Sequence, residues 1–326
     1  MKVFARAALV IGLAVMIVLI AREGARSIMT LLAHAGWTLL LLVPLHTLPL
    51  FLDVLGWRAL IGASGRVREL FLIASIREAI NRLLPVANVG GEIVGVRLLA
   101  QQGMDIMAAA ASVIVEVLLN LISQYLFLVL GVVCILRLTN AVPAIGATLL
   151  GLGAALSVLG TLIALLHNGW VFRRIERLAQ ELRTRARGGL TSLRQATQLH
   201  AAIRTLLGAR GRLLRALGWQ FAGLIAGCAE TWLALRWLGT PVGVGPAIVL
   251  ESVTQAARHL IFIVPAGLGV QEAGLIGACH LFGLGRDVAI ALSLAKRMRE
   301  ILFGLPALIA WQWIEGRRGF LRLRRQ

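Results

Sequence analysis

The chain has 326 residues, of which 59% are hydrophobic and 15% are charged, and its mean hydropathy is +0.85. A soluble globular domain carries about 25% charged residues, so this composition excludes that class and predicts an all-α polytopic membrane protein. The formal net charge of +18 comes from 33 basic and 15 acidic residues. Because the basic residues mostly flank apolar runs, we expect anionic membrane lipids as partners, and no nucleic acid.

Apolar runs of about 20 residues are long enough to cross a bilayer. They predict about six spanning helices, at residues 3–21, 37–60, 107–136, 143–166, 217–238 and 288–313. Basic residues favour the cytoplasmic side of a membrane. The arginines that follow the second run, Arg66 and Arg68, and the arginine-rich tail from Arg317 therefore predict that both termini are cytoplasmic.

A further apolar segment, residues 70–99, is interrupted by Pro85, Gly90 and Gly91. Each of its halves, at about fifteen residues, is short for a crossing. A broken backbone is tolerated in lipid only where protein or a watery cavity shields it. We interpret this segment as a re-entrant helical hairpin that opens from the cytoplasm.

A second interrupted segment, residues 247–282, contains Pro265, Gly267 and Gly269. A single displacement along the chain relates landmarks of the two segments: Pro85 to Pro265, Glu92 to Glu272 and Gly103 to Gly283. By the span count the second hairpin enters from outside, which makes the two segments an inverted repeat, an architecture typical of transporters. An alternative is that each hairpin spans the bilayer as two short helices, which gives ten crossings.

The chain therefore divides into three parts. Residues 1–169 form an N-terminal membrane half with the first hairpin, and residues 216–326 form a C-terminal half with the second. Between them, residues 170–215 hold eleven arginines and must be cytoplasmic. This basic segment is either an amphipathic interfacial helix or a solvated connector.

Polar residues inside membrane segments are candidate binding residues, because they are costly there. In the first half they are Arg77, Asn81, Arg82, Pro85, Asn88, Gly90, Gly91, Glu92, Arg97 and Glu116. In the second half they are Arg258, His259, Pro265, Gly267, Gly269, Glu272, Arg297 and Glu300.

Arg77 and Arg82 precede the first break, and a half-helix begins after it. An arginine fork beside a helix N-terminus suits a phosphate group. Alternatively, Arg77, Arg82 and Arg97 extend to the lipid headgroups on the cytoplasmic side. For Glu92 we favour an ion pair with Arg97 over proton carriage, although burial raises a carboxyl pKa. His259 is a satisfied polar residue in our interpretation, with no zinc spacing nearby.

The cysteines lack metal-site spacing. No phosphate-binding loop, dinucleotide signature or nucleophile elbow occurs in the sequence. We therefore predict no metal, no cofactor and no enzymatic activity.

The string NRLLPVANVGGEIVGVRLLA, with the later VPAGLGVQEAG, resembles the flippase-like family that is also called the lysylphosphatidylglycerol synthase transmembrane region. LLPVANVGGE and LFGLPALIAWQ look like its hopanoid-biosynthesis-associated subfamily. The resemblance covers nearly the whole chain. It implies a multi-pass bacterial inner-membrane protein that moves or handles lipids, including aminoacylated phospholipids and polyprenyl-linked glycans. The soluble aminoacyl-transferase domain of some relatives is not in this sequence, so we expect no lysyl transfer.

We expect a lipid transporter or flippase that binds an anionic headgroup through Arg77, Arg82, Arg258 and Arg297. Two alternatives remain open. One is an accessory protein that holds lipid-biosynthesis enzymes through residues 170–215. The other is an intramembrane enzyme that acts through Glu92 or Glu272.

Overall fold

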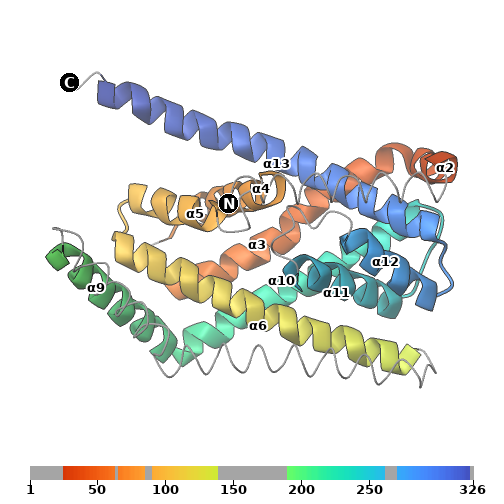
Figure 1. Ribbon diagram of the computed structural model, residues 1–326, viewed down its shortest axis with the longest axis horizontal. Helices are drawn as coiled ribbons and strands as arrows, with labels where there is room; N and C mark the ends of the chain where they lie inside the picture. Colours follow the sequence, from red (N-terminus) through yellow and green to blue (C-terminus); the bar gives the residue numbers. More distant parts are fainter. Residues whose placement is uncertain (1–24, 63–64, 85–89, 139–188, 261–269, 324–326) are drawn as a thin grey trace.

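The computed structural model describes residues 25–62, 65–84, 90–138, 189–260 and 270–323. Every regular element in these ranges is a helix, as Figure 1 shows, so the all-α prediction is confirmed for the described part of the chain.

The first group of helices comprises α2 (Ala25–Ala35), the 3₁₀ helix η1 (Gly36–Leu41), α3 (Leu42–Ile61), α4 (Val67–Leu83), α5 (Gly90–Gln101) and α6 (Ile106–Leu138). The second group comprises α9 (Gly189–Gly208), α10 (Arg210–Trp237), α11 (Val244–Leu260), α12 (Val270–Leu281) and α13 (Arg286–Leu323).

Two described stretches, Met29–Ile61 and Ile106–Leu138, are long and apolar enough to cross a membrane. They include the predicted spans 37–60 and 107–136. Helices α10 and α13 occupy the places of spans 217–238 and 288–313. Spans 3–21 and 143–166 lie outside the described residues, as does the first part of the segment 170–215.

The two interrupted segments each contain two helices, α4 with α5 and α11 with α12. Helix α4 ends where the sequence predicts. Leu84 follows it with φ −107° and ψ 144°, the extended conformation that a following proline favours.

The turns after α5 and α12 have the same hydrogen bonds. The N–H groups of Gln102 and Met104 both donate to Leu99 O, and 180 residues later those of Phe282 and Leu284 donate to Cys279 O. Each turn includes a glycine in the left-handed region, Gly103 with φ 94° and Gly283 with φ 70°, where a side chain would be strained. The internal repeat predicted from the sequence therefore extends to the backbone.

Contacts between helices also occur in matching pairs. Helices α3 and α10 pack on each other, α6 packs on α11 as α13 packs on α4, and α6 packs on α9 as α13 packs on α2. Exchanging the two groups of helices therefore reproduces the contacts. In Figure 1, α4 and α5 lie on the left and α11 and α12 on the right, and α6 and α13 run in opposite directions.

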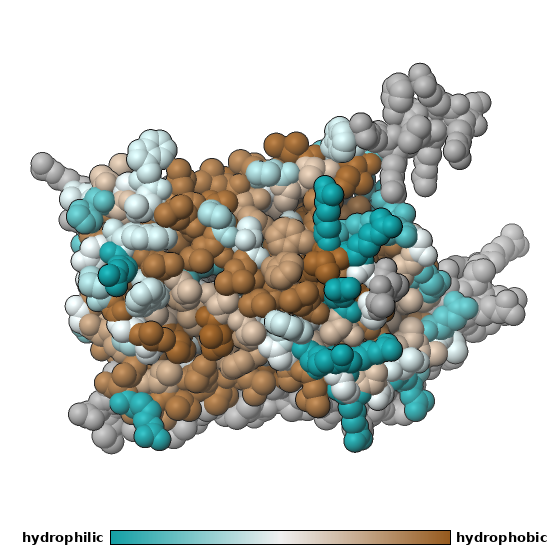
Figure 2. Space-filling view, turned by 180° about the vertical axis from the view of Figure 1, so that it is seen from behind, coloured by the Kyte–Doolittle hydropathy of each residue, from teal (hydrophilic) through white to brown (hydrophobic). Residues whose placement is uncertain are grey.

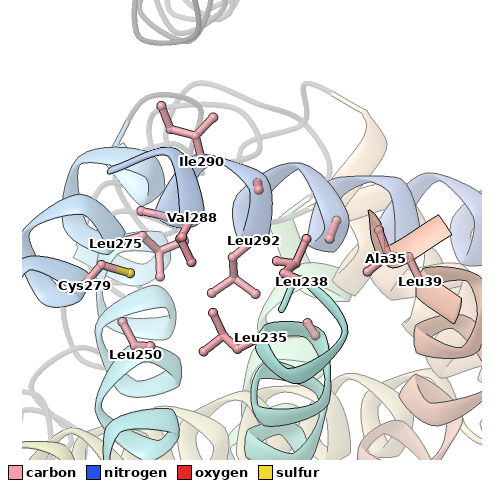
Figure 3. Packing of buried hydrophobic residues seen from close by; sticks show 14 of the residues in the cluster. Ala35, Leu39, Leu235, Leu238, Leu250, Leu275, Cys279, Val288, Ile290 and Leu292 are labelled. Atoms are coloured by element: carbon pink, nitrogen blue, oxygen red, sulfur yellow. The ribbon is translucent and has the colours of Figure 1, made fainter. Parts of the chain in front are cut away.

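An apolar cluster packs the second pair of helices. Leu250 of α11, Leu275 and Cys279 of α12 and Leu292 of α13 are fully buried and point toward one another, with Leu235 of α10 (Figure 3). Burying a leucine side chain stabilises a water-soluble fold by about 1.5–3 kcal/mol, and in a bilayer close packing takes over that role. A second apolar cluster surrounds Trp57 and packs α3, α4 and α5 together.

The outer surface is largely apolar. In Figure 2, hydrophobic residues cover most of the visible face, and hydrophilic residues gather mainly toward the right, which is the left side of Figure 1. Ile301, Leu305 and Ile309 of α13 are each more than 45% exposed. Such a large exposed apolar surface is typical of contact with membrane or protein.

Candidate functional site: a charged cavity between the two groups of helices

A cavity of about 600 Å³ lies between the two groups of helices. Residues from α3, α4, α5 and α6 line it on one side, and residues from α10, α11 and α13 line it on the other. Its charged lining residues are Asp53, Glu78, Glu92, Glu116, Glu230, Glu251, Arg77, Arg82 and Arg299, and His46 also reaches it. Among these, carboxylates outnumber arginines.

Arg77 is the centre of the first ion cluster. Its guanidinium donates to Glu92 of α5, and Nη2 lies 2.6 Å from Oε2 of Glu116 on α6. It also stacks over the Trp57 ring, 4.6 Å from the centroid. Because Arg77 is only 7% exposed, its charge depends on these two carboxylates. The cluster joins α4, α5 and α6.

Asn81 of α4 also binds the first turn of α5. Its side-chain amide donates to Glu92 at 3.2 Å, and its carbonyl oxygen accepts the Gly91 N–H at 2.9 Å. A Cβ on Gly91 would lie 2.4 Å from the Arg77 carbonyl oxygen, so this position admits only glycine. One N–H at the start of α5 is therefore already bound within the protein.

The second ion cluster lies on α11 and α13. Lys296 donates to Glu251, which also accepts hydrogen bonds from Thr231 at 2.5 Å and from Gln255 at 2.8 Å. All but Gln255 are buried. The pair joins α11 to α13 as Arg77 and Glu116 join α4 to α6.

Glu272 of α12 is held in the same region. It accepts hydrogen bonds from Arg297 at 2.7 and 2.9 Å and from the Ser293 hydroxyl at 2.7 Å. Glu272 and Glu92 are equivalent in the repeat, and each is bound by an arginine. The arginine comes from α4 in the first repeat and from α13 in the second.

A third cluster crosses between the two groups. The two ring nitrogens of His46 lie 2.8 Å from Glu230 of α10 and 3.0 Å from Glu78 of α4. Arg299 of α13 places Nε 3.4 Å from Glu230 and Nη1 3.9 Å from Glu78. Four helices therefore meet at one charged cluster.

Asp53 of α3 differs from the other carboxylates of the cavity. It lines the cavity beside Gly223, where a Cβ would lie 2.7 Å from its Oδ1. Within the described part of the chain, no hydrogen bond or ion pair joins its carboxylate to another residue. Asp53 is therefore available to a ligand.

A family model described as the lysylphosphatidylglycerol synthase TM region matches residues 5–307. The chain belongs to this family. No curated protein and no solved structure matches the chain. Membership of this transmembrane-region family confirms the resemblance and, with the apolar helices, indicates a lipid-related membrane protein. The hopanoid-associated subfamily stays a prediction.

The structure brings together five of the residues that the sequence singled out. Arg77, Asn81, Arg82, Glu92 and Glu116 all line the cavity of this family member. Arg77 does not extend to the lipid headgroups, because it is buried.

The predicted pair between Glu92 and Arg97 is wrong. Glu92 is bound by Arg77, whereas Arg97 has a 61% exposed side chain on α5 and lies 3.4 Å from Glu315. Glu92 and Arg97 are five residues apart, which places their side chains on different faces of α5, whereas Arg77 reaches Glu92 from the neighbouring helix α4. The headgroup-facing interpretation therefore suits Arg97.

Other predicted residues lie away from the cavity or outside the described part. Glu272, Arg297 and Glu300 do not line the cavity among the described residues, and Glu300 lies 3.9 Å from Arg299. Five predicted residues lie outside the described residues: Pro85, Asn88, Pro265, Gly267 and Gly269. Arg258 and His259 lie in α11, but their side chains are not among those described. Gly90 begins α5.

The candidate binding residues chosen from the sequence did not include six titratable residues of the cavity, which are His46, Asp53, Glu78, Glu230, Glu251 and Arg299. His46 and Asp53 lie within the apolar run 37–60, and Glu78 directly follows Arg77. The sequence could have identified them, because an ionisable residue inside a membrane span is by default a candidate functional residue.

Proposed function

We propose that this protein moves a membrane lipid between leaflets by passing its headgroup through the cavity while the tail stays in the bilayer. The observation that carries the proposal is a charged cavity, lined by both repeats, in a membrane chain of a lipid-related family. A polar cavity inside an apolar chain is costly, which favours a functional role.

The repeated arrangement supports a transport role rather than a static one. Matching helix contacts and the opposite directions of α6 and α13 fit an inverted repeat, in which rocking of one repeat against the other exposes a central site to alternate sides. In this proposal α4–α5 and α11–α12 are re-entrant hairpins from opposite faces. The protein lies in the bacterial inner membrane with both termini in the cytoplasm.

The wall of the cavity favours a headgroup that carries an amine. Arg77, which we expected to attract an anionic headgroup, is bound by two carboxylates. Asp53 is the carboxylate that remains without such a partner among the described residues. An ammonium group would pair with it, whereas a bare phosphate would meet excess negative charge. Of the lipids considered, an aminoacylated phospholipid fits best.

The test uses purified protein in phosphatidylglycerol liposomes that contain lysyl-phosphatidylglycerol. A membrane-impermeant amine reagent labels outer-leaflet headgroups, so movement appears as labelling of the inner pool. Asp53→Asn should slow the movement about tenfold or more, the effect of losing roughly 1.4 kcal/mol of interaction in the rate-limiting state.

The matched control is Asp287→Asn, which removes a carboxylate at the start of α13, away from the cavity lining. It should move lipid at the wild-type rate. Wild-type protein that does not move lysyl-phosphatidylglycerol faster than empty liposomes, while it moves a fluorescent phosphatidylglycerol, would reject the amine headgroup. Movement of neither lipid would count against transport itself.

A further inference from the structure

His46 is held between the two groups of helices by a carboxylate at each ring nitrogen. Nδ1 lies 2.8 Å from Oε1 of Glu230, and Nε2 lies 3.0 Å from Oε2 of Glu78. His46 is 9% exposed, and its ring meets Phe303 of α13 edge-on with centroids 5.0 Å apart. Contacts with α4, α10 and α13 therefore fix the orientation of the imidazole.

This geometry requires a bound proton. A neutral imidazole donates from one nitrogen and accepts at the other, whereas an ionised carboxylate only accepts. Both nitrogens of His46 can donate only when the ring carries two protons. Without the extra proton, a nitrogen lone pair would face a buried carboxylate oxygen, which is costly in a low-dielectric site. In this arrangement, His46, Glu78 and Glu230 together hold one proton more than a neutral imidazole and two ionised carboxylates would hold.

The surrounding charges balance that proton. Charged groups near His46 come from every helix packed around it: Arg77, Glu78 and Arg82 of α4, Glu230 of α10, Arg299 and Glu300 of α13, Glu116 of α6 and Asp53 of α3 itself. The carboxylates closest to the ring cluster, Glu78, Glu230 and Glu300, are matched by Arg82, Arg299 and a protonated His46. Loss of the proton would leave this buried cluster negative.

The cluster also spans the two repeats and borders the cavity. His46 and Glu78 belong to α3 and α4, whereas Glu230 and Arg299 belong to α10 and α13, and all four line the cavity. Any movement that separates these helix pairs breaks a His46 contact. The proton then has an acceptor at once, namely water in the cavity.

We propose that His46, with Glu78 and Glu230, binds the proton that couples lipid movement to a proton gradient. The site holds a proton while the repeats are joined at the cluster, releases it to cavity water when they separate, and takes up a proton again when they rejoin. The inference rests on the proposed lipid movement for its purpose, but the bound proton can be tested independently.

The first test reads the protonation of His46 directly. Protein labelled with ¹⁵N-histidine is placed in lipid nanodiscs, and the His46 signals are assigned by their loss in His46→Gln. At about pH 7.5, where an ordinary histidine is mostly neutral, both His46 nitrogens should carry protons. In Glu230→Gln, one of them should have lost its proton at that pH. A neutral His46 in the wild-type protein overturns the proposal, whether or not lipid moves.

The second test measures coupling in the lysyl-phosphatidylglycerol liposomes. A gradient of about one pH unit should change the wild-type rate by up to about tenfold, the ratio of proton activities for one coupled proton. In His46→Gln the ratio of rates with and without the gradient should fall to about one. His280→Gln, the same change at an exposed position of α12, should keep the wild-type ratio.

Gradient dependence that persists in His46→Gln overturns the coupling role. If that variant moves no lipid at all, Glu230→Gln replaces it in the same comparison, with the same two outcomes. Wild-type protein that moves no lipid under any gradient argues against the proposed function, whereas the protonation of His46 is still decided by the first test.

Discussion

The α4–α5 and α11–α12 pairs have the same backbone plan but are held together differently. Equivalent positions of the second helix are Gly91 and Gly95 in α5 but Gln271 and Leu275 in α12. In the first pair, glycines let α5 approach the buried Arg77 closely, since a Cβ on Gly95 would lie 2.6 Å from Arg77 Cδ. In the second pair, Leu275 packs in the apolar cluster of Figure 3.

The charged residues of the two repeats also occupy different positions. Glu116 of α6 and Lys296 of α13 are equivalent in the repeat, yet they have opposite charges. In the first repeat, α4 is joined to the long helix α6 by a cation on α4, Arg77. In the second repeat, α11 is joined to the long helix α13 by a cation on α13, Lys296. A repeat thus conserves backbone geometry while the side chains that stabilise each copy diverge. Among the described residues, α4 and α5 line more of the cavity than α11 and α12 do.

The largest expected effect concerns the opposite placement of the two pairs. Single cysteines at Gln102 and Arg286, in a chain with the native cysteines replaced, should react with an impermeant maleimide from opposite sides of the membrane. Both positions are exposed, so the contrast should be nearly all-or-none. Labelling of both from the same side would make the repeats parallel and would remove the main structural support for alternating access.

A second difference should appear in stability. Arg77→Met leaves the buried Glu116 and the half-buried Glu92 without their cation and should lower the free energy of unfolding by about 3–5 kcal/mol. Lys296→Met should cost less, because Glu251 keeps its hydrogen bonds from Thr231 and Gln255. Thermal unfolding in detergent, followed by tryptophan fluorescence, measures both.

The matched control for Arg77 is Arg97→Met, on the exposed face of α5, which should change stability by less than about 1 kcal/mol. Equal loss of stability in the Arg77 and Arg97 variants would contradict the central role of Arg77 in the first cluster.

The smallest effect separates the packing of the two pairs. Gly91→Ala places a methyl group against the Arg77 backbone and should destabilise by about 1–3 kcal/mol. Gly277→Ala, in α12, meets no atom within 4 Å and should be neutral or stabilising by up to about 1 kcal/mol, since alanine favours helix. The same thermal unfolding applies, and a Gly91 variant as stable as the Gly277 variant would contradict the close approach of α5.

Several features of the fold follow from local sequence. Pro85 ends α4, because a proline forces the preceding residue into the extended region, and Gly103 and Gly283 end α5 and α12. Apolar run length located α3, α6, α10 and α13, since the bilayer sets the length of a crossing. The displacement of proline, glutamate and glycine landmarks revealed the repeat.

The candidate site was only partly predictable. Arg77, Glu92 and Glu116 stood out because charges inside apolar segments are rare. Their partners did not, because Arg77 reaches Glu116 across 39 residues and His46 reaches Glu230 across 184. Closeness in the sequence suggested Arg97 for Glu92, although five residues along a helix place the two side chains on different faces, and it gave no indication of His46, Asp53 or Glu78.

The sequence by itself determined that this is an all-helical membrane chain with two related, interrupted segments, because hydropathy, prolines and glycines act locally. Only the tertiary structure decided which charges neutralise one another and which carboxylate, that of Asp53, is left facing the cavity. The physical reason is that a buried charge is stabilised by whatever lies within a few ångströms of it, and that neighbourhood is created by helices packing across the repeat.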